Sequence, residues 1–365
     1  MADQKTPSWF TWLRKKLPSR GGKPLIIAAY KSYGTKRDIY LRGRVLEDNT
    51  IVKHESRGAF RMIRNTIRRF NTFEKPDMEV ICSIADNHFA ELTNEEGFFR
   101  LLQKINPLQV ANENKTNWIP VSCHLKVDPE VMATTQMMIP TAEAEFGVIS
   151  DIDDTIMHTG VASFLKWQLV YNSALKHVQK RTPLIGAPSF YQALEKGLDG
   201  KNTNPFFYIS NSPWNLYTYL NRFLENHKFP LGPILLRDFA FPGTKGYRNE
   251  KDHKQREIIN IFKTYPHLNF VLLGDSAEHD ASIYSEVARQ FPERVICIYL
   301  HTIQKKKQMK YVEGIVNTSK HVEMLLVNKA EDAAIHAKER GLITNAEFLT
   351  VRKKEEQPKK QAKGF

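Results

Sequence analysis

The sequence predicts an α/β protein in which a doubly wound parallel sheet follows a smaller β-rich domain. From residue 146 onward, short and continuous apolar runs alternate with amphipathic segments of helical periodicity. Continuous apolarity is typical of a strand that is buried on both faces of a sheet. Before that point, short runs rich in β-branched and aromatic residues are bounded by turn residues, which is typical of a β-rich domain. A chain of 365 residues has room for both.

Five apolar runs are expected to form the parallel sheet: residues 146–149, 206–209, 234–236, 270–273 and 295–300. Amphipathic helices are expected between them, over Trp214–His227 and Lys254–Tyr265. Alternating strands and helices form right-handed connections between parallel strands. Ligands of such sheets bind beyond the carboxyl ends of the strands, where the strand order reverses. Polar side chains that follow these runs are therefore candidates for a site.

The rest of the chain divides by composition. A basic and aromatic lead over 1–22 ends in a Pro- and Gly-containing linker, and the β-rich domain covers 23–140. Its expected strands lie at residues 25–30, 38–46, 78–82 and 117–121, with a helix at 60–70. The α/β domain covers 141–320 and holds a small helical insert at 156–200, which either covers the site as a lid or packs as an ordinary helix pair. Helices are expected over 321–350, and the charged residues 351–365 are expected to be a disordered tail.

The lengths of the apolar runs and the number of cysteines indicate the cellular compartment in which the protein is expected. No run of 18 apolar residues occurs, so no membrane-spanning helix is expected, and the start of the chain lacks the pattern of a signal peptide. The cysteines Cys82, Cys123 and Cys297 are odd in number and far apart in the sequence. That spacing argues against a disulfide framework or a cysteine metal site. We therefore expect a soluble, cytoplasmic protein.

The net charge of +13 favours polyanionic partners, either phospholipid surfaces, nucleic acid or acidic small substrates. Basic runs near both ends carry much of this charge, and they can equally be solvated tails. Within residues 9–17, apolar and aromatic side chains share one helical face beside three basic residues. This pattern favours peripheral membrane contact, although docking on the chain's own domain is an alternative. No motif of base-stacking aromatics supports nucleic-acid binding.

Two acidic residues, Asp151 and Asp153, follow the first apolar run of the α/β domain. Residues two apart in an extended segment point the same way, so both carboxylates can face one site. Adjacent carboxylates repel each other, which favours a cation between them or protonation of one. One can attack phosphorus as a nucleophile, and the other can act as general acid and base. The alternative is an acidic surface turn, and Asp154 receives no chemical role.

Ser210 and Asn211 follow the second apolar run. The Ser210 hydroxyl and the backbone amide after it, just before a helix that begins near Pro213, form a suitable cradle for a phosphate group. The alternative is that Asn211 or Ser212 only caps that helix.

Asp275 and Asp280 follow the apolar run 270–273, where oxygen ligands for a hard cation could meet Asp151. Mg²⁺ takes oxygen ligands, usually one or two carboxylates with water and phosphate oxygens. A fixed cation is also needed, because a carboxylate and a phosphoryl group repel each other. Lys254 is the first choice, and Lys245 and Lys251 are alternatives that spacing does not separate.

The order of these motifs resembles the haloacid dehalogenase superfamily of phosphatases, and in particular its actin-patch-associated phosphatidate phosphatase family. The resemblance covers about residues 25–345. It rests on Gly147–Ile156, Ser210–Trp214, His253-Lys254 and Gly274-Asp275-Ser276 with Asp280. Ala277 and Glu278 depart from the family, in which a Gly-Gln pair is common, and this puts substrate detail in doubt more than catalysis.

The resemblance implies a haloacid dehalogenase-like Rossmannoid domain with Asp151 as nucleophile and Asp153 as general acid and base. It further implies Lys254 as charge clamp, Thr155 and Ser210 near the phosphate, and Asp275 and Asp280, with Asp151 and Asp153, around Mg²⁺. The expected function is a Mg²⁺-dependent phosphatase that forms an aspartyl-phosphate, with phosphatidate as the substrate. The alternatives are a phosphatase of a soluble phosphate ester or nucleotide, and a non-catalytic protein that binds phospholipids or polyanions.

Overall fold

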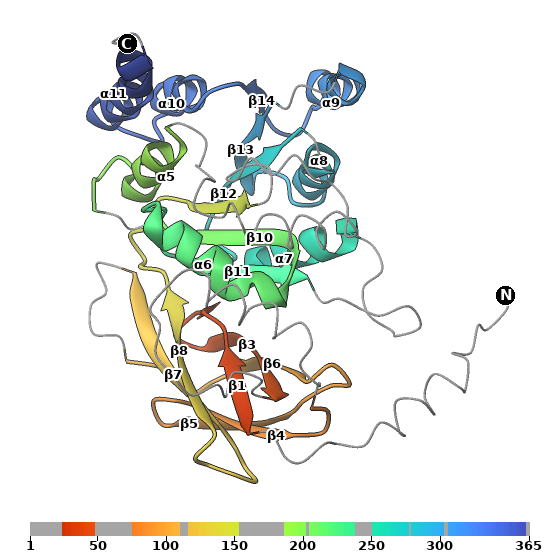
Figure 1. Ribbon diagram of the computed structural model, residues 1–365. Coiled ribbons are helices and arrows are strands. Elements are labelled where there is room, and N and C mark those ends of the chain that lie inside the picture. Colours follow the sequence, from red (N-terminus) through yellow and green to blue (C-terminus); the bar gives the residue numbers. More distant parts are fainter. Residues whose placement is uncertain are drawn as a thin grey trace, which may run out of the picture.

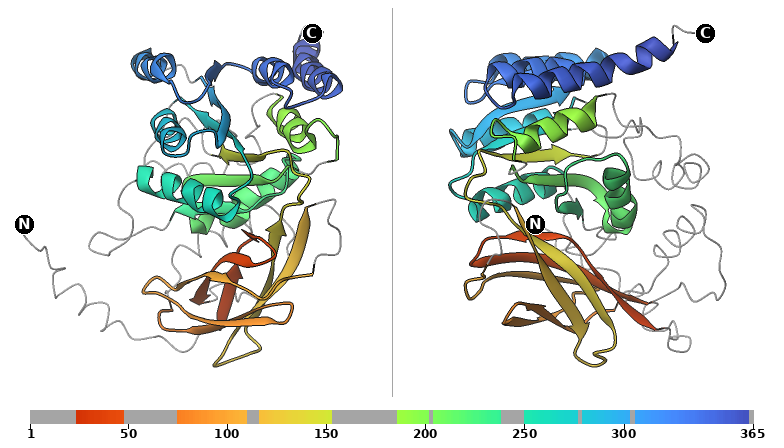
Figure 2. Two further views of the ribbon diagram at one scale, coloured as in Figure 1. Left: turned by 180° about the vertical axis from the view of Figure 1, so that it is seen from behind. Right: turned by 90° about the vertical axis from the view of Figure 1, so that its left-hand side faces the viewer.

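The computed structural model describes residues 24–47, 75–109, 116–152, 186–201, 204–237, 250–276, 279–302 and 306–362. Within these ranges the chain forms two sheets, one mixed and one entirely parallel, with the helices on the faces of the parallel sheet (Figures 1 and 2). This confirms an α/β protein with a β-rich N-terminal region. The expected lead over 1–22 and the expected helix over 60–70 lie outside the described residues.

The β-rich region is an eight-stranded sheet with the order β1-β3-β2-β8-β7-β4-β5, and β6 pairs with β3. All its pairs are antiparallel except β2 with β8. The four strands expected from the sequence are β1, β3, β4 and β7. The strands are β1 Leu25–Ala29, β2 Ser32–Gly34, β3 Asp38–Glu47, β4 Glu79–Ile84, β5 Asn87–Leu92, β6 Phe98–Lys104, β7 Asn117–Leu125 and β8 Met132–Ile139.

Two of the cysteines are neighbours inside this sheet. Cys82 on β4 pairs directly with Cys123 on β7, and their sulfur atoms lie 3.4 Å apart. Both thiols are buried and free. The hydrogen bond from Cys123, together with burial, raises the pKa of Cys82. The distance between them in the sequence therefore gave no indication of their contact in space.

The parallel sheet has the order β11-β10-β9-β12-β13-β14. The order reverses at β9, since the chain adds β10 and β11 on one side of it and β12 to β14 on the other. All five expected apolar runs form strands. The bounds are β9 Gly147–Asp151, β10 Phe206–Pro213, β11 Ile234–Arg237, β12 Phe270–Asp275, β13 Val295–His301 and β14 Met324–Val327.

Helices cover both faces of this sheet (Figure 2). Apolar side chains of α5, α6, α10 and α11 share one core cluster with one face, and those of α7, α8 and α9 share a second cluster with the other. The sheet is therefore doubly wound, as the sequence predicts. The helices are α5 Ala187–Lys196, α6 Tyr217–Asn226, α7 Glu250–Thr264, α8 Asp280–Gln290, α9 Lys306–Thr318, α10 Ala330–Glu339 and α11 Asn345–Ala362. None of the described helices is long and apolar enough to cross a membrane.

The C-terminal region differs from the prediction in two respects. Residues 321–350 are not all helical, because the apolar run Met324–Val327 is the edge strand β14; a short apolar run does not distinguish strand from helix. The charged residues from 351 are not a disordered tail over their described length, because α11 continues to Ala362. Val351 is fully buried, and the buried Glu355 accepts a 2.9 Å hydrogen bond from the backbone nitrogen of Glu331 on α10. These two contacts hold the helix on the domain.

The β-rich sheet packs against the β11 edge of the parallel sheet (Figure 1). On one side Tyr30 stacks on Trp214, with ring centroids 4.2 Å apart. On the other side Tyr33 and Tyr40 belong to the core cluster that contains α7. The two sheets therefore share apolar cores, and the open edge of the parallel sheet is covered.

Candidate active site

Asp151 is the last residue of the central strand β9, at the point where the strand order reverses. Its neighbours are apolar strands on both sides, and the residue is fully buried. The backbone here is held by Ser150, whose hydroxyl donates a 2.7 Å hydrogen bond to the carbonyl oxygen of Asp151 and lies 2.8 Å from the Tyr191 hydroxyl. A polar serine at the end of a buried apolar run was the sequence signal for this support.

Lys254 joins two of the candidate carboxylates. Its Nζ lies 2.8 Å from Oδ1 of Asp151 and 2.7 Å from Oδ1 of Asp280, and all three side chains are buried. Helix α7 brings Lys254 here because the lysine shares its buried face with Ile258 and Ile261, which pack on the sheet. An ammonium group that is withdrawn from water needs such partners.

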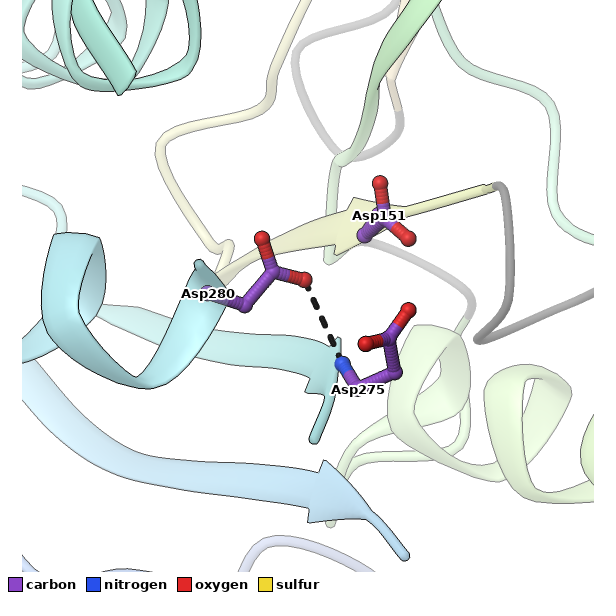
Figure 3. Close-up of side chains that lie close together, drawn as sticks. All are labelled: Asp151, Asp275 and Asp280. Atoms are coloured by element: carbon purple, nitrogen blue, oxygen red, sulfur yellow. Dashed lines mark hydrogen bonds between the residues drawn. The ribbon is translucent and has the colours of Figure 1, made fainter. Parts of the chain in front are cut away.

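Asp275 and Asp280 complete a group of carboxylates (Figure 3). Asp275 ends β12, and its backbone nitrogen donates a 3.2 Å hydrogen bond to Oδ2 of Asp280 in the first turn of α8. One carboxylate oxygen from each of Asp151, Asp275 and Asp280 lies within 4.8 Å of the others. Carboxylates this close require positive charge, which Lys254 supplies in part.

Gly274 explains how the carboxylates come so close. A Cβ atom at this position would lie 2.7 Å from Oδ2 of Asp280 and 2.7 Å from the Tyr284 ring. The glycine sits inside β12, so its role is the close approach of Asp280 to the strand.

Ser210 and Asn211 lie near the carboxyl end of β10, the strand beside β9. Ile209 is the register partner of Asp151, so Ser210 lies next to the end of β9. The ladder between β10 and β11 is interrupted after Ser210, and the backbone nitrogen of Ser212 donates a 2.9 Å hydrogen bond to the Ser210 hydroxyl. A bulge of this kind re-aims backbone groups next to a site. The helix expected near Pro213 begins there, as a 3-10 turn over Trp214–Leu216 that continues into α6 at Tyr217. Its N-cap residue is Pro213, so neither Asn211 nor Ser212 caps it.

Several sequence candidates are not described. Asp153, Asp154, Thr155 and Lys245 lie outside the described residues, as does the side chain of Lys251, whose backbone belongs to α7. Most of the expected insert, residues 156–185, lies there too, and its remaining part contains α5. Their roles stay predictions.

Two further polar residues near these elements were not predicted. Arg237 ends β11 and pairs in register with Pro213, so it lies at the same edge of the sheet as Ser210. Glu257 lies on α7 less than one helical turn after Lys254 and is buried against the β-rich sheet. Arg237 directly follows the apolar run 234–236, so the signal that revealed the other candidates was present for it, whereas Glu257 follows no such run.

The arrangement combines three buried carboxylates, a buried ammonium group and a serine beside a strand bulge. Carboxylate oxygens are the ligands that Mg²⁺ prefers, and an ammonium group can offset the negative charge of a bound phosphate. The site is therefore suited to binding a hard cation and transferring a phosphoryl group.

Residues 146–302 match the family model described as "Phosphatidate phosphatase APP1, catalytic domain". This segment is similar to that catalytic domain. All six described candidates lie inside the matched segment: Asp151, Ser210, Asn211, Lys254, Asp275 and Asp280. The β-rich sheet, β14, α9, α10 and α11 lie outside the segment that matches the APP1 catalytic domain.

Two yeast relatives are similar over part of the chain. "Phosphatidate phosphatase APP1" of Saccharomyces cerevisiae is 32% identical over 194 residues, which is 51% of this chain and 32% of the relative. An uncharacterized protein of Schizosaccharomyces pombe is 26% identical over 218 residues, 59% of this chain and 34% of that protein. The alignments with this APP1-like chain thus span about a third of the length of each relative. A solved carbohydrate acetylesterase from Xanthomonas citri overlaps 87% of this chain and 75% of its own at 6% identity, but its TM-score of 0.24 supports no argument about the fold.

Proposed function

We propose that the protein is a Mg²⁺-dependent phosphatase that acts through an aspartyl-phosphate on Asp151, with phosphatidate as its substrate. The observation that carries this proposal is the buried bridge of Lys254 between Asp151 and Asp280, within the segment that matches the APP1 catalytic domain. The parallel sheet order around β9 fits the haloacid dehalogenase-like Rossmannoid domain that the sequence resembles.

The residues present fit a bound magnesium ion. Asp151, Asp275 and Asp280 are buried, carry only oxygen donors and bring one oxygen each within 4.8 Å of the others. These three, with Asp153, would hold the ion. Bound Mg²⁺ would supply positive charge that draws the phosphate oxygens toward the nucleophile.

Side chains of the protein would carry out the nucleophilic attack, the proton transfers and the binding of the phosphate group. Asp151 would attack phosphorus, because it ends the central strand and its carboxylate is fixed by Lys254. The phosphorus–oxygen bond to the leaving group breaks as the aspartyl-phosphate forms, and Asp153 would donate a proton to the leaving oxygen. Asp153 would then take a proton from the water that hydrolyses the aspartyl-phosphate. Ser210, Asn211 and Thr155 would bind the phosphate oxygens, and burial of the site limits competing water.

Phosphatidate is proposed as the substrate on the name of the yeast relative, and the basic character of the chain is consistent with an anionic lipid. A phosphatase of this lipid works at a bilayer surface, so peripheral membrane contact through residues 9–17 and a cytoplasmic location belong to the same proposal. A soluble phosphate ester remains the second candidate, since the site chemistry is the same for any phosphomonoester.

The test is phosphate release from phosphatidate in mixed micelles and from soluble phosphate esters, each with Mg²⁺ or with a chelator. We expect Mg²⁺-dependent release that is largest with phosphatidate. Phosphate release from soluble esters alone would show that phosphatidate is not the substrate. No release from any phosphate ester would refute the proposed phosphatase activity.

The nucleophile is tested with Asp151→Asn, which keeps the size of the side chain and removes the attacking oxygen anion. We expect turnover to fall by roughly 10⁴-fold or more, as for other nucleophile removals. Asp199→Asn, at an exposed position away from the carboxylate group, is the matched control and should keep full activity. Substantial turnover in Asp151→Asn would assign the nucleophile to another group.

A further inference from the structure

We propose that the β-rich domain positions the ammonium group of Lys254 through a contact between Tyr40 and Glu257. The proposal rests on the proposed function, in which Lys254 fixes the nucleophile and offsets the phosphate charge. Tyr40 and Glu257 would be positioning residues, because neither belongs to the group around Asp151.

The contact joins β3 of the β-rich sheet to helix α7 across a buried interface. The Tyr40 hydroxyl on β3 donates a 3.0 Å hydrogen bond to Oε2 of Glu257 on α7, and both side chains are buried. Tyr33 stacks on Tyr40 at 4.6 Å between ring centroids, which fixes the direction of the phenol. A hydrogen bond to a buried charged group is among the stronger ones in proteins.

Glu257 is held as an anion in this interior. Burial alone would raise the pKa of Glu257, but the positive charges around it lower the pKa below its usual value. The nearby groups that lower it belong to His253, Arg42, Arg256 and Arg100. Arg42 and Arg100 come from the β-rich sheet, so this sheet supplies both a hydrogen bond and charge to one point on α7.

That point is next to Lys254 on the same helix. Glu257 follows Lys254 by three residues, about 4.5 Å along the helix axis. Lys254 must keep both its distances of 2.8 and 2.7 Å to the carboxylates, and its long side chain has many rotamers. Fixing the helix at Glu257 therefore limits the movement of the ammonium group.

The same domain also holds the segment that follows Ser210. Trp214 is stacked on Tyr30, and the guanidinium of Arg42 lies 4.9 Å from the Trp214 ring centroid. Arg44 donates a 3.0 Å hydrogen bond from Nη1 to the Asn215 side-chain oxygen. Two segments that carry candidate site residues thus rest on one face of the β-rich sheet.

The chain provides a matched control at the far end of α7. The Tyr265 hydroxyl donates a 3.0 Å hydrogen bond to the carbonyl oxygen of Gly34 and is buried at the same interface. Tyr265 lies about three helical turns, roughly 16 Å, beyond Lys254. Tyr40→Phe and Tyr265→Phe therefore remove the same hydroxyl from the same interface, at two distances from the site.

The first measurement is Mg²⁺-dependent phosphate release from phosphatidate in mixed micelles by both variants of the full chain. We expect kcat of Tyr40→Phe to fall roughly 10- to 100-fold with KM changed less than about threefold, since small misplacements of catalytic groups have effects of this size. Tyr265→Phe should stay within about twofold of the parent kcat at a similar loss of thermal stability. Equal losses of kcat in the two variants would overturn the proposal.

The second measurement does not require activity. Lysine acetylation by an amine-reactive ester is followed by mass spectrometry, with the exposed Lys126 as the reference. We expect Lys254 to react roughly tenfold faster in Tyr40→Phe than in the parent or in Tyr265→Phe, because local opening exposes it. Glu257→Asp, which shortens the acceptor, is the second variant for the same contact if Tyr40→Phe does not fold, and the same acceleration is expected.

The two outcomes separate the two proposals. Absence of turnover in the parent would refute the phosphatase, while faster acetylation of Lys254 in Tyr40→Phe would still support positioning. Equal acetylation of Lys254 in all folded variants would refute positioning, whatever the activity of the parent.

Discussion

Lys254→Met removes the positive charge that joins two buried carboxylates and nearly preserves the volume of the side chain. The aspartates lie 2.8 and 2.7 Å from Nζ in the parent. In the variant, Asp151, Asp275 and Asp280 keep their negative charges within 4.8 Å of each other without the internal cation. We therefore expect a large loss of folding stability.

The magnitude follows from these distances. At an effective dielectric constant of about 20, each pair at such a distance attracts with about 6 kcal/mol. Much of this is offset, because the variant no longer has to withdraw an ammonium group from water. Removal of one partner from comparable buried pairs costs about 3–5 kcal/mol, and we expect a loss in this range.

Urea denaturation at pH 8 in the absence of divalent ions measures this loss. Lys196→Met is the matched control, since Lys196 forms a 2.9 Å ion pair with Glu347 in which both side chains are partly exposed. The control should lose less than about 1 kcal/mol. Adding Mg²⁺ should then stabilise Lys254→Met more than the parent, because the three carboxylates have lost their internal counterion.

A loss in Lys254→Met no greater than that in Lys196→Met would refute the bridge as a source of stability. Equal stabilisation of the variant and the parent by Mg²⁺, or none, would contradict the assignment of the carboxylates as a cation site.

Two further predictions concern other parts of the chain. Burial of Glu195 raises its pKa from 4.5 to about 7, an effect that Lys196 only partly offsets, so the parent loses stability as the pH rises through this interval. Glu195→Gln lacks that loss, so at pH 8 its free energy of unfolding should exceed that of the parent by about 1–2 kcal/mol, allowing for partial exposure. At pH 4.5 we expect no gain. Urea titrations at both pH values measure the two differences, and equal differences would contradict the prediction. Val351→Ala should cost about 2 kcal/mol because Val351 is fully buried in α11, whereas Leu349→Ala on the exposed face should stay within about 0.5 kcal/mol. Similar values in thermal unfolding would show that α11 does not pack on the domain.

The parallel sheet could be predicted because its strands are continuous apolar runs that are followed by polar residues. Asp151, Asp275 and Ser210 were found in this way, and the structure brings Asp151 and Asp275 together with Asp280. Lys254 was harder, since spacing alone did not separate it from Lys251. Its alignment with Ile258 and Ile261 on one helix face was visible in the sequence and agrees with its burial.

Other features depend on information that local patterns do not contain. The charged sequence after 351 gave no sign of a helix, because few of its residues are apolar; Val351 and Glu355 are buried against the domain. The contact of Cys82 with Cys123 follows from the register of two strands, and that of Tyr40 with Glu257 follows from how the two sheets dock. Neither register nor docking leaves a periodic signal within a short stretch of residues.

The covered β11 edge has a consequence for where this protein can be divided. The borders of the sequence family, at 146 and 302, pass between elements that are paired in space: β14 completes the sheet beside β13, and α10 and α11 cover one of its faces. A fragment cut at these borders would present an unpaired strand on one side and uncovered aromatic rings, such as Trp214, on the other. The segment that matches the family model is thus smaller than the set of elements that pack together. A substitution on β3 can therefore affect the candidate active site through α7, although β3 lies outside the segment that matches the family.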